Sequence, residues 1–492
     1  WHNYPTELDS PYHLLMGKMF ADHGRVVLWD SYEFAPVGRP HLYPPLLHIL
    51  VWLIHVLVPT TFMNIGRIIV TFQSLMGLFF VWFFAKRFFS ASVAFLALVF
   101  YASSTESWWW QTSVSPIALI TVLFLPFVYL FYKKRVAACI LILSACFYLH
   151  YGLSFTLVLT TFLATLCCAQ YRKAYLKNFF VITLSSVLLF LPWLVHLHRH
   201  RDYFFHHAKG LGNLKMLSLE IYWPEILINF NIVLWFFCII GFVFCLKKIK
   251  EDFKYSLLAS AFLAYFVFLF LFEAARFNSH SALVYSVLGG LGAVLAWEWI
   301  RRAQMFSVRL ILKSYFIFVI ALSLFFEFHY LPLESFLKDK KTKAYIGFMD
   351  MPVREIFIRP TPLLNEIRAF ATGTPLLGKH RIRIQAFFTS PIARQLLAYV
   401  RKHVDPQSIL HMDNPALADY ITLVLGIKTD TGMYWEAVTP EMMQAIEKIR
   451  TSGYYISTTS DFRYLVPRAY ARAKKFPPVI ESIGVFNIGY WP

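Results

Sequence analysis

Long apolar segments separated by short polar loops fill most of the chain up to residue 330. About ten of them approach the roughly 20 residues that a helix needs to cross a bilayer. Apolar runs of this length predict membrane-spanning helices rather than strands. We expect spans at 66–85, 90–104, 113–132, 136–150, 152–169, 179–196, 229–246, 255–273, 279–299 and 311–330.

Positive charge is concentrated in every second loop between these spans. Because lysine and arginine are enriched in cytoplasmic loops, we expect these loops to be cytoplasmic. Alternation then places the first loop (1–65), the loop 197–228 and the residues after 330 on the extracytoplasmic face, where all candidate chemistry falls. The basic clusters lie at 86–87, 133–135, 172–173, 247–248 and 301–302.

The segment 46–58 is apolar but too short to cross the bilayer, and prolines flank it on both sides. If it did cross, every later basic loop would lie outside the cell. We therefore predict a helix that lies along the membrane surface.

The character of the chain changes after Tyr330, where mixed charges and turn sequences replace the apolar runs. About 160 residues remain, enough for one soluble domain. We therefore divide the chain into a transmembrane domain, 1–330, and a C-terminal soluble domain, 331–492. Strand-like stretches at 408–413, 421–425 and 453–457 and amphipathic helices at 391–403 and 440–451 predict a small α/β domain.

Composition supports an integral, multi-pass membrane protein. The chain is 58% hydrophobic and only 15% charged, with a mean hydropathy of +0.54. A net charge of +18 suggests nucleic-acid binding in a soluble protein, but here the cations lie in short loops, so we expect no nucleic-acid partner. The six cysteines lie in apolar segments and predict neither disulfides nor a zinc site. The chain begins with Trp1, so we expect a missing N-terminal segment.

The first loop carries the most distinctive motifs. It reads Leu-Asp-Ser-Pro-Tyr-His-Leu at 8–14, Trp-Asp at 29–30, Pro-Val-Gly at 36–38 and Tyr-Pro-Pro at 43–45. In order and spacing it resembles the first external loop of the catalytic subunit of oligosaccharyltransferase. The resemblance implies a polytopic α-helical membrane protein with the fold of the C superfamily of glycosyltransferases and a C-terminal soluble α/β domain.

In that family the first aspartate helps bind a divalent cation and activates the acceptor nitrogen, and the matching residue is Asp9. Transfer from a polyprenyl diphosphate needs positive charge at the leaving group, and Mg²⁺ or Mn²⁺ prefers carboxylate oxygens. The alternative is structural, because an aspartate before Ser-Pro often caps a helix.

The second external loop matches the family only in Gln111-Thr112, because no acidic pair follows. The metal site is therefore completed elsewhere or is absent. Glu106 and His150 are candidate ligands on the same face, against the alternative of polar anchors in an interfacial aromatic belt.

The loop 197–228 begins with His198, Arg199 and His200. It is either a basic loop that contacts lipid phosphates or, by resemblance, the external loop that covers donor and acceptor. In the second interpretation Glu220, just before a proline, contacts the acceptor, with Glu225 as the fallback. A zinc site is possible on histidine spacing alone.

Arg276 matches the arginine that contacts the donor diphosphate in the family. A guanidinium suits this role because it is always charged and binds two oxygens at once. The alternative is a salt bridge to Glu273.

The soluble domain lacks the family's Trp-Trp-Asp-Tyr-Gly motif, which reads the Ser/Thr of the Asn-x-Ser/Thr acceptor. The nearest fragment, Ala-Asp-Tyr at 418–420, we interpret as strand or turn. We expect an inverting glycosyltransferase whose partners are a polyprenyl-linked sugar donor, a protein or other extracytoplasmic acceptor, and membrane lipid. Two alternatives are a polyprenyl-monophosphate donor with a lipid or polysaccharide acceptor, and a lipid-linked-glycan transporter.

Overall fold

The computed structural model describes most of the membrane domain and the core of the C-terminal domain. For 269–271, 274–279, 324–330 and 356–360, and for residues 391, 440, 483, 486 and 491, it describes the backbone alone. The described residues are 9–104, 111–203, 231–271, 274–330, 356–360, 391–412, 414–432, 439–450, 453–457, 479–483 and 486–491.

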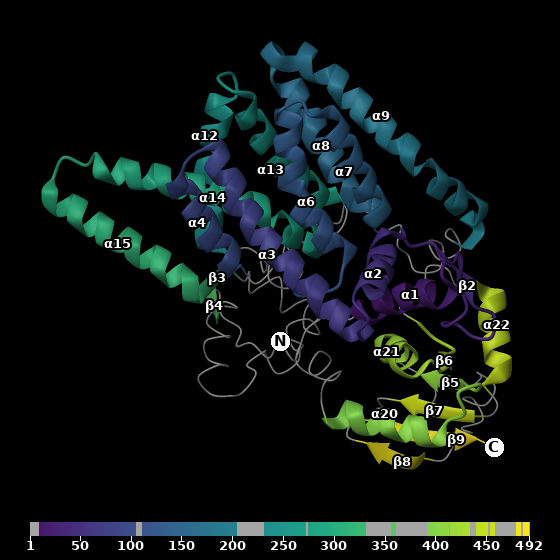
Figure 1. Ribbon diagram of the computed structural model, residues 1–492. Helices are drawn as coiled ribbons and strands as arrows, with labels where there is room; N and C mark the ends of the chain where they lie inside the picture. Colours follow the sequence, from purple (N-terminus) through teal and green to yellow (C-terminus); the bar gives the residue numbers. More distant parts are fainter. Residues whose placement is uncertain are drawn as a thin grey trace.

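Within these residues, each of the ten predicted spans corresponds to one helix, and together the helices form the bundle in Figure 1. The last one ends five residues early, because 326–330 form a strand instead of continuing the helix. The helices are α3 (Phe62–Phe88), α4 (Ala91–Ser103), α6 (Pro116–Tyr132), α7 (Val136–Leu149), α8 (Tyr151–Cys167), α9 (Ala169–Arg199), α12 (Ile232–Lys248), α13 (Phe253–Leu271), α14 (Ala274–Arg301) and α15 (Phe306–Phe325).

Four helices in the described part are long and apolar enough to cross a membrane by length and composition alone: 62–88, 169–199, 280–301 and 306–323. The others are shorter apolar helices packed among them. Glycines permit the closest packing, between α12 and α14. A Cβ on Gly292 would lie 1.9 Å from the Phe237 carbonyl oxygen, and one on Gly241 would lie 2.1 Å from that of Leu288. Small residues at helix crossings serve this purpose in membranes.

The first loop folds into a compact unit at one end of the bundle. It contains α1 (Ser10–His23), a two-residue antiparallel pair of β1 (Trp29–Asp30) with β2 (Arg39–Pro40), and α2 (Leu46–Leu57). Gly17 of α1 faces Val51 of α2, where a Cβ would lie 2.3 Å from the Val51 Cγ1, so the glycine allows the two helices to approach closely. The predicted short helix at 46–58 is confirmed; its position on the membrane surface stays a prediction.

The C-terminal domain is built on a five-stranded sheet in the order β6-β5-β7-β9-β8. Strand β5 is parallel to β6 and to the central strand β7, whereas β9 runs antiparallel to β7 and β8. Helices α20, α21 and α22 accompany the sheet. The elements are α20 (Pro391–His403), β5 (Ile409–Met412), α21 (Pro415–Leu425), β6 (Lys428–Thr429), α22 (Pro440–Ile449), β7 (Gly453–Ser457), β8 (Val479–Ile483) and β9 (Phe486–Trp491).

The prediction of a strand at 421–425 is wrong, because this run belongs to α21. Local capping explains the difference: the Asn414 side chain accepts from the Leu417 N–H at 2.9 Å, Pro415 occupies the first turn, and Gly426 ends the helix with φ +76°. These are strong helix boundaries. A further antiparallel pair, β3 (Phe326–Tyr330) with β4 (Ile356–Pro360), follows α15.

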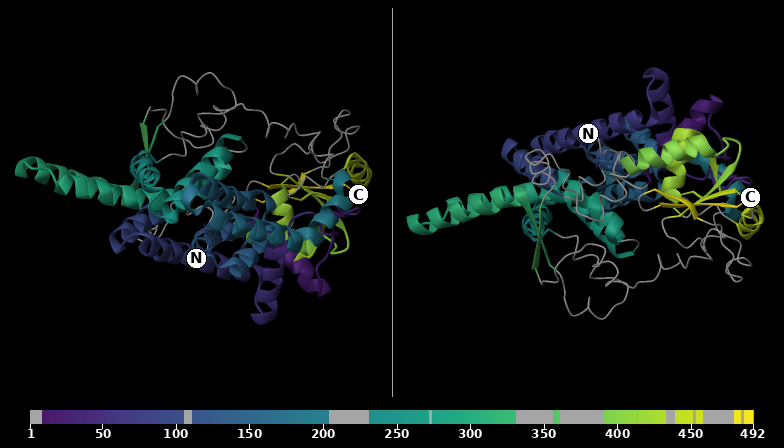
Figure 2. Two further views of the ribbon diagram at one scale, coloured as in Figure 1. Left: turned by 90° about the horizontal axis from the view of Figure 1, so that it is seen from above. Right: turned by 90° about the horizontal axis from the view of Figure 1, so that it is seen from below.

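The first-loop unit lies between the bundle and the sheet, as the views in Figures 1 and 2 agree. Helix α21 packs directly on α1. The backbone of the first loop also extends the sheet edge, since the Ala35 N–H donates to the Thr429 carbonyl at 2.9 Å and the Thr429 N–H donates to that of Tyr32 at 3.1 Å. The two parts of the chain therefore meet at α1.

Candidate functional site

Asp9 stands at the N-terminus of α1, beside the second external loop. The Ser10 hydroxyl accepts from the Val114 N–H at 3.0 Å, which fixes the start of α1 against residues 111–114. Gln73 of α3 holds the same segment by donating to the carbonyls of Gln111 and Ser113. The two loops that the family resemblance associates with the site are thus in contact.

The capping alternative for Asp9 receives no support from the geometry. Its backbone occupies the N-cap position, but its side chain makes no capping hydrogen bond to α1. A capping aspartate normally accepts from the second or third N–H of the helix. The half-buried Asp9 therefore does not close the helix through its side chain.

A buried cluster of charges joins the first loop to α21 next to this position. The Arg39 guanidinium forms an ion pair with Glu33 and lies 3.6 Å from the Asp30 carboxylate. It also covers the ring of Tyr12 in α1, at 5.5 Å from Cζ to the ring centre. Asp419 of α21 completes the cluster from the other domain, and all five side chains are almost fully buried.

Three carboxyl groups share one guanidinium in this cluster, so they cannot all be ionised. Burial raises the pKa of Glu33 to about 8 and that of Asp419 to about 7, and it raises the pKa of Asp30 as well. The negative charge of Asp9 contributes to the increase at Asp419, which places the two aspartates in one electrostatic environment. The cluster therefore holds protons near neutral pH.

Sequence reasoning missed this cluster. Glu33 and Arg39 lie inside the recognised first loop, but no motif singles them out, and Asp419 was interpreted as part of a strand or turn. The usable signal is local: Asp419 is a single acid among apolar residues of a capped helix. An ionisable residue on an apolar helix face requires a partner.

Three histidines form a buried hydrogen-bonded chain behind α1. His13 Nδ1 lies 3.0 Å from His48 Nε2, and His48 Nδ1 lies 3.1 Å from His41 Nε2. Burial, with the neighbouring histidines adding to it, lowers the pKa of His13 to about 3, and burial also keeps the pKa values of His41 and His48 well below the usual value. All three rings are therefore neutral at pH 7, and each donates one hydrogen bond at most.

The tautomers of these three histidines follow from His41 Nδ1, which is buried and has no hydrogen-bond partner. If His13 donated to His48 and His48 donated to His41, the proton of His41 would lie on Nδ1 as a buried N–H without an acceptor. Buried N–H groups without an acceptor are rare. We therefore assign the protons so that His41 donates to His48 and His48 donates to His13.

The remaining predicted histidines lie around this chain. His150 Nδ1 accepts from the Leu153 N–H at 3.1 Å and so caps α8, and its ring lies 6.1 Å from that of Tyr43. At the end of α9, His196 donates to the His41 carbonyl at 2.9 Å. The loop that starts there is thereby anchored to the first loop.

The basic triplet predicted at the start of that loop lies instead at the end of α9, which includes His198 and Arg199 and has His200 as its C-cap. His198 and Arg199 are exposed, and His200 is half-buried and donates to the His196 carbonyl at 3.1 Å. Glu106, Glu220 and Glu225 lie outside the described residues. Arg276 lies in the first turn of α14, where the structure describes the backbone but not the side chain.

Among the residues that the structure describes, no three His, Cys, Asp or Glu side chains form a metal-binding group. The carboxylate of Asp9 has the chemistry that a hard divalent cation prefers, and the residue is half-buried where the two loops meet. The metal-site prediction for Asp9, Glu106 and His150 stays a prediction.

Comparison with known proteins places the fold. No family model matches the chain, and no curated protein matches its sequence. The archaeal oligosaccharyltransferase AglB from Archaeoglobus fulgidus, solved with an inhibitory peptide and a dolichol-phosphate, matches with a TM-score of 0.57 at 12% identity, over 96% of this chain and 67% of that chain. ArnT from Cupriavidus metallidurans, solved with undecaprenyl phosphate, matches with a TM-score of 0.58 at 11% identity, over 98% of this chain and 93% of that chain.

These similarities confirm the expected resemblance at the level of the fold. They extend over the membrane domain and the C-terminal sheet together, although the sequences are nearly unrelated. The chain is therefore an integral, mostly helical membrane protein that shares the fold of these two structures and ends in a C-terminal α/β domain.

Proposed function

We propose that this protein transfers a sugar or glycan from a polyprenyl-phosphate carrier to an acceptor on the extracytoplasmic face of the membrane. The observation that carries the proposal is the position of Asp9, whose side chain does not cap α1, where the first loop meets the second loop and α21. Both structural relatives were solved with a polyprenyl phosphate, dolichol-phosphate in AglB and undecaprenyl phosphate in ArnT, which supports this donor class.

In the proposed mechanism the acceptor nucleophile attacks the anomeric carbon and the bond to the phosphate oxygen breaks in a single inverting displacement. Asp9 orients the nucleophile and takes up its proton. Arg276 binds the phosphate that leaves with the electron pair, and Glu220 positions the acceptor. A divalent cation, when bound at Asp9, would supply further positive charge for the leaving phosphate.

Two versions of the reaction differ in donor and acceptor. An oligosaccharyltransferase-like reaction uses a polyprenyl diphosphate and a protein acceptor. The alternative is a polyprenyl-monophosphate reaction on lipid or polysaccharide. In length the chain is closer to ArnT, since it covers 93% of ArnT but only 67% of AglB. The missing acidic pair and the missing Trp-Trp-Asp-Tyr-Gly motif agree with this second version.

Mass spectrometry of the lipids that co-purify in mild detergent distinguishes the versions. A polyprenyl diphosphate oligosaccharide supports the first, and a polyprenyl monophosphate sugar supports the second. If only glycan-free lipids are found, even after incubation with both donor classes, the donor part of the proposal is wrong.

Asp9→Asn tests the role of the carboxylate. We expect at least a 100-fold loss of transfer, in line with the contribution of a general base of roughly 10²–10⁴. Asp22→Asn is the matched control: Asp22 lies on the same helix, is exposed, and contacts only Lys18 and Tyr32 among the printed interactions of the described residues. Near-normal turnover of Asp9→Asn would remove Asp9 from the site.

A further inference from the structure

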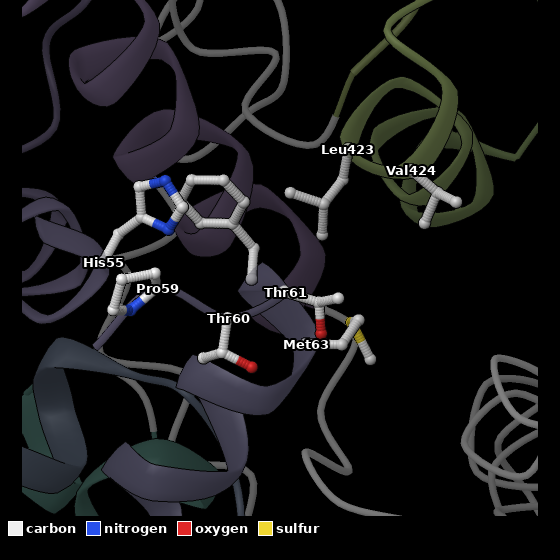
Figure 3. A pocket seen from close by; sticks show the side chains of 8 residues that line it. His55, Pro59, Thr60, Thr61, Met63, Leu423 and Val424 are labelled. Atoms are coloured by element: carbon white, nitrogen blue, oxygen red, sulfur yellow. The ribbon is translucent and has the colours of Figure 1, made fainter.

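A pocket of about 560 Å³ lies where the corner between α2 and α3 meets the end of α21 (Figure 3). Small-molecule sites have volumes of roughly 300–1,000 Å³. His55 and residues 59–63 form the wall from the membrane domain, and Leu423 and Val424 form the wall from the C-terminal domain. The pocket is therefore shared between the two domains and is separate from the surroundings of Asp9.

Exposed apolar side chains lie on both helices that form the corner of the pocket. α3 is long and apolar enough to span the membrane, and its side chains Ile68, Phe72 and Leu75 are exposed. On the other side of the pocket, Val56 and Leu57 of α2 are 62% and 70% exposed. Since α3 begins at Phe62, the pocket lies at the end of a candidate span, where acyl chains meet head groups.

A cation without a carboxylate partner stands next to the pocket. Arg67 lies one helical turn after Met63, on the same face of α3. Its Nη1 donates to the Asn64 side chain at 2.6 Å, and Asn64 in turn donates to the Thr60 hydroxyl in the pocket wall at 3.0 Å. Within the described residues, no acidic group lies within ion-pair distance of Arg67, and its Nε is buried without an acceptor.

Two more observations concern the walls of the pocket. Burial raises the pKa of Tyr420 in α21, and the nearby Arg67 guanidinium opposes that increase, so Arg67 faces the C-terminal domain. In the wall from the membrane domain, the His55 ring stacks on Phe62 at 4.5 Å, and its buried Nδ1 has no partner. Two buried polar atoms thus lack partners beside an apolar pocket.

We propose that the pocket binds one phospholipid of the bilayer, with an acyl chain between Met63 and Leu423 and the phosphate accepting hydrogen bonds from Arg67 and Thr60. A phospholipid satisfies both halves of the site: the apolar walls and the unpaired guanidinium, which is the side chain best suited to a phosphate. The bound lipid contacts α3 and α21 together, so it holds the C-terminal domain against the membrane surface.

The test uses the full-length protein in phosphatidylcholine nanodiscs that contain a trace of phosphatidylglycerol with a photoactivatable acyl chain. After irradiation, peptide mass spectrometry measures the label at 59–63 and 423–424 relative to the exposed apolar face of α9. We expect enrichment at the pocket. Arg67→Met should reduce it about tenfold, the effect of losing one hydrogen bond to a charged group. Arg87→Met, at the other end of α3, should leave it unchanged.

A second variant tests the same site in case Arg67→Met fails to fold. Val424→Trp fills the pocket from an exposed position of α21 and should also abolish the enrichment while Arg67 remains. Equal labelling of pocket and α9, or enrichment that survives both variants, would overturn the proposal. Unlabelled phosphatidylglycerol should compete; equal competition by diacylglycerol would refute phosphate recognition, and competition by polyprenyl phosphate alone would show that a sugar carrier, not a bulk phospholipid, is the occupant.

Discussion

Replacing Arg39 by methionine removes the single cation from the buried cluster that joins the two domains. The chain lengths are similar, so packing against Tyr12 and Phe34 is largely retained, whereas Glu33 and Asp30 lose their counter-charge. Breaking a buried ion pair by removing one partner costs about 3–5 kcal/mol. At about 2–4 °C per kcal/mol, the Tm should fall by roughly 6–20 °C.

The pH dependence of this loss is the sharper part of the prediction. Without the guanidinium, the carboxyl groups must bind further protons to remain buried, whereas in the unfolded chain they release them above about pH 4.5. The folded pKa is raised above the unfolded value, so stability is lost as the pH rises. For each extra proton that the folded variant holds relative to the unfolded chain, its loss of stability should grow by about 1.4 kcal/mol per pH unit.

Thermal unfolding in mild detergent, followed by tryptophan fluorescence at pH 6 and pH 8, measures both quantities. Arg25→Met is the matched control, because Arg25 belongs to the same loop but is exposed. The reasoning about the cluster is wrong if Arg39→Met lowers the Tm no more than Arg25→Met does, or if its effect at pH 8 does not exceed its effect at pH 6.

Three further predictions follow from the same region and from the bundle. Stability should be greatest near pH 5–6.5. At lower pH the unfolded chain protonates histidines that stay neutral when folded, such as His13 with a pKa of about 3, and at higher pH the carboxyl groups with raised pKa values lose the protons that stabilise their burial. Asp419→Asn should therefore flatten the alkaline decline of the Tm between pH 6.5 and 8. His48→Leu removes the hydrogen-bond partner of His13 Nδ1 and of His41 Nε2 and should lower the free energy of unfolding by about 2–4 kcal/mol. His55→Leu on the same helix should lower it little, and equal effects of the two variants would contradict the histidine chain. Gly292→Leu would place a side chain against the Phe237 carbonyl and should abolish a monodisperse peak in gel filtration, whereas Gly152→Ala, opposite a movable His150 ring, should preserve it.

The parts of the candidate site that could be predicted from the sequence are those that belong to a recognisable motif. Asp9 and the segment at 111–113 belong to separate loops of the family pattern, and the structure brings them together through Ser10 and Val114. The histidine chain escaped prediction, because His13, His41 and His48 come from two helices and a loop whose relative packing no local pattern encodes.

Sequence alone determined the elements of the membrane domain, because a continuous apolar run of sufficient length has no other stable state in a bilayer than a helix. It also determined the amphipathic helices α20 and α22, whose periodicity is local. The fate of 421–425 was decided by caps rather than by composition.

Only the tertiary structure decided which ionisable groups share one environment. Asp419 meets Glu33 and Arg39 across almost the whole length of the chain, and their protonation depends on the exclusion of water by α1 and α21. Desolvation and the distances between charges are properties of the packed molecule. Local sequence patterns carry no information about them, which is why the buried link between the two domains appears only in the fold.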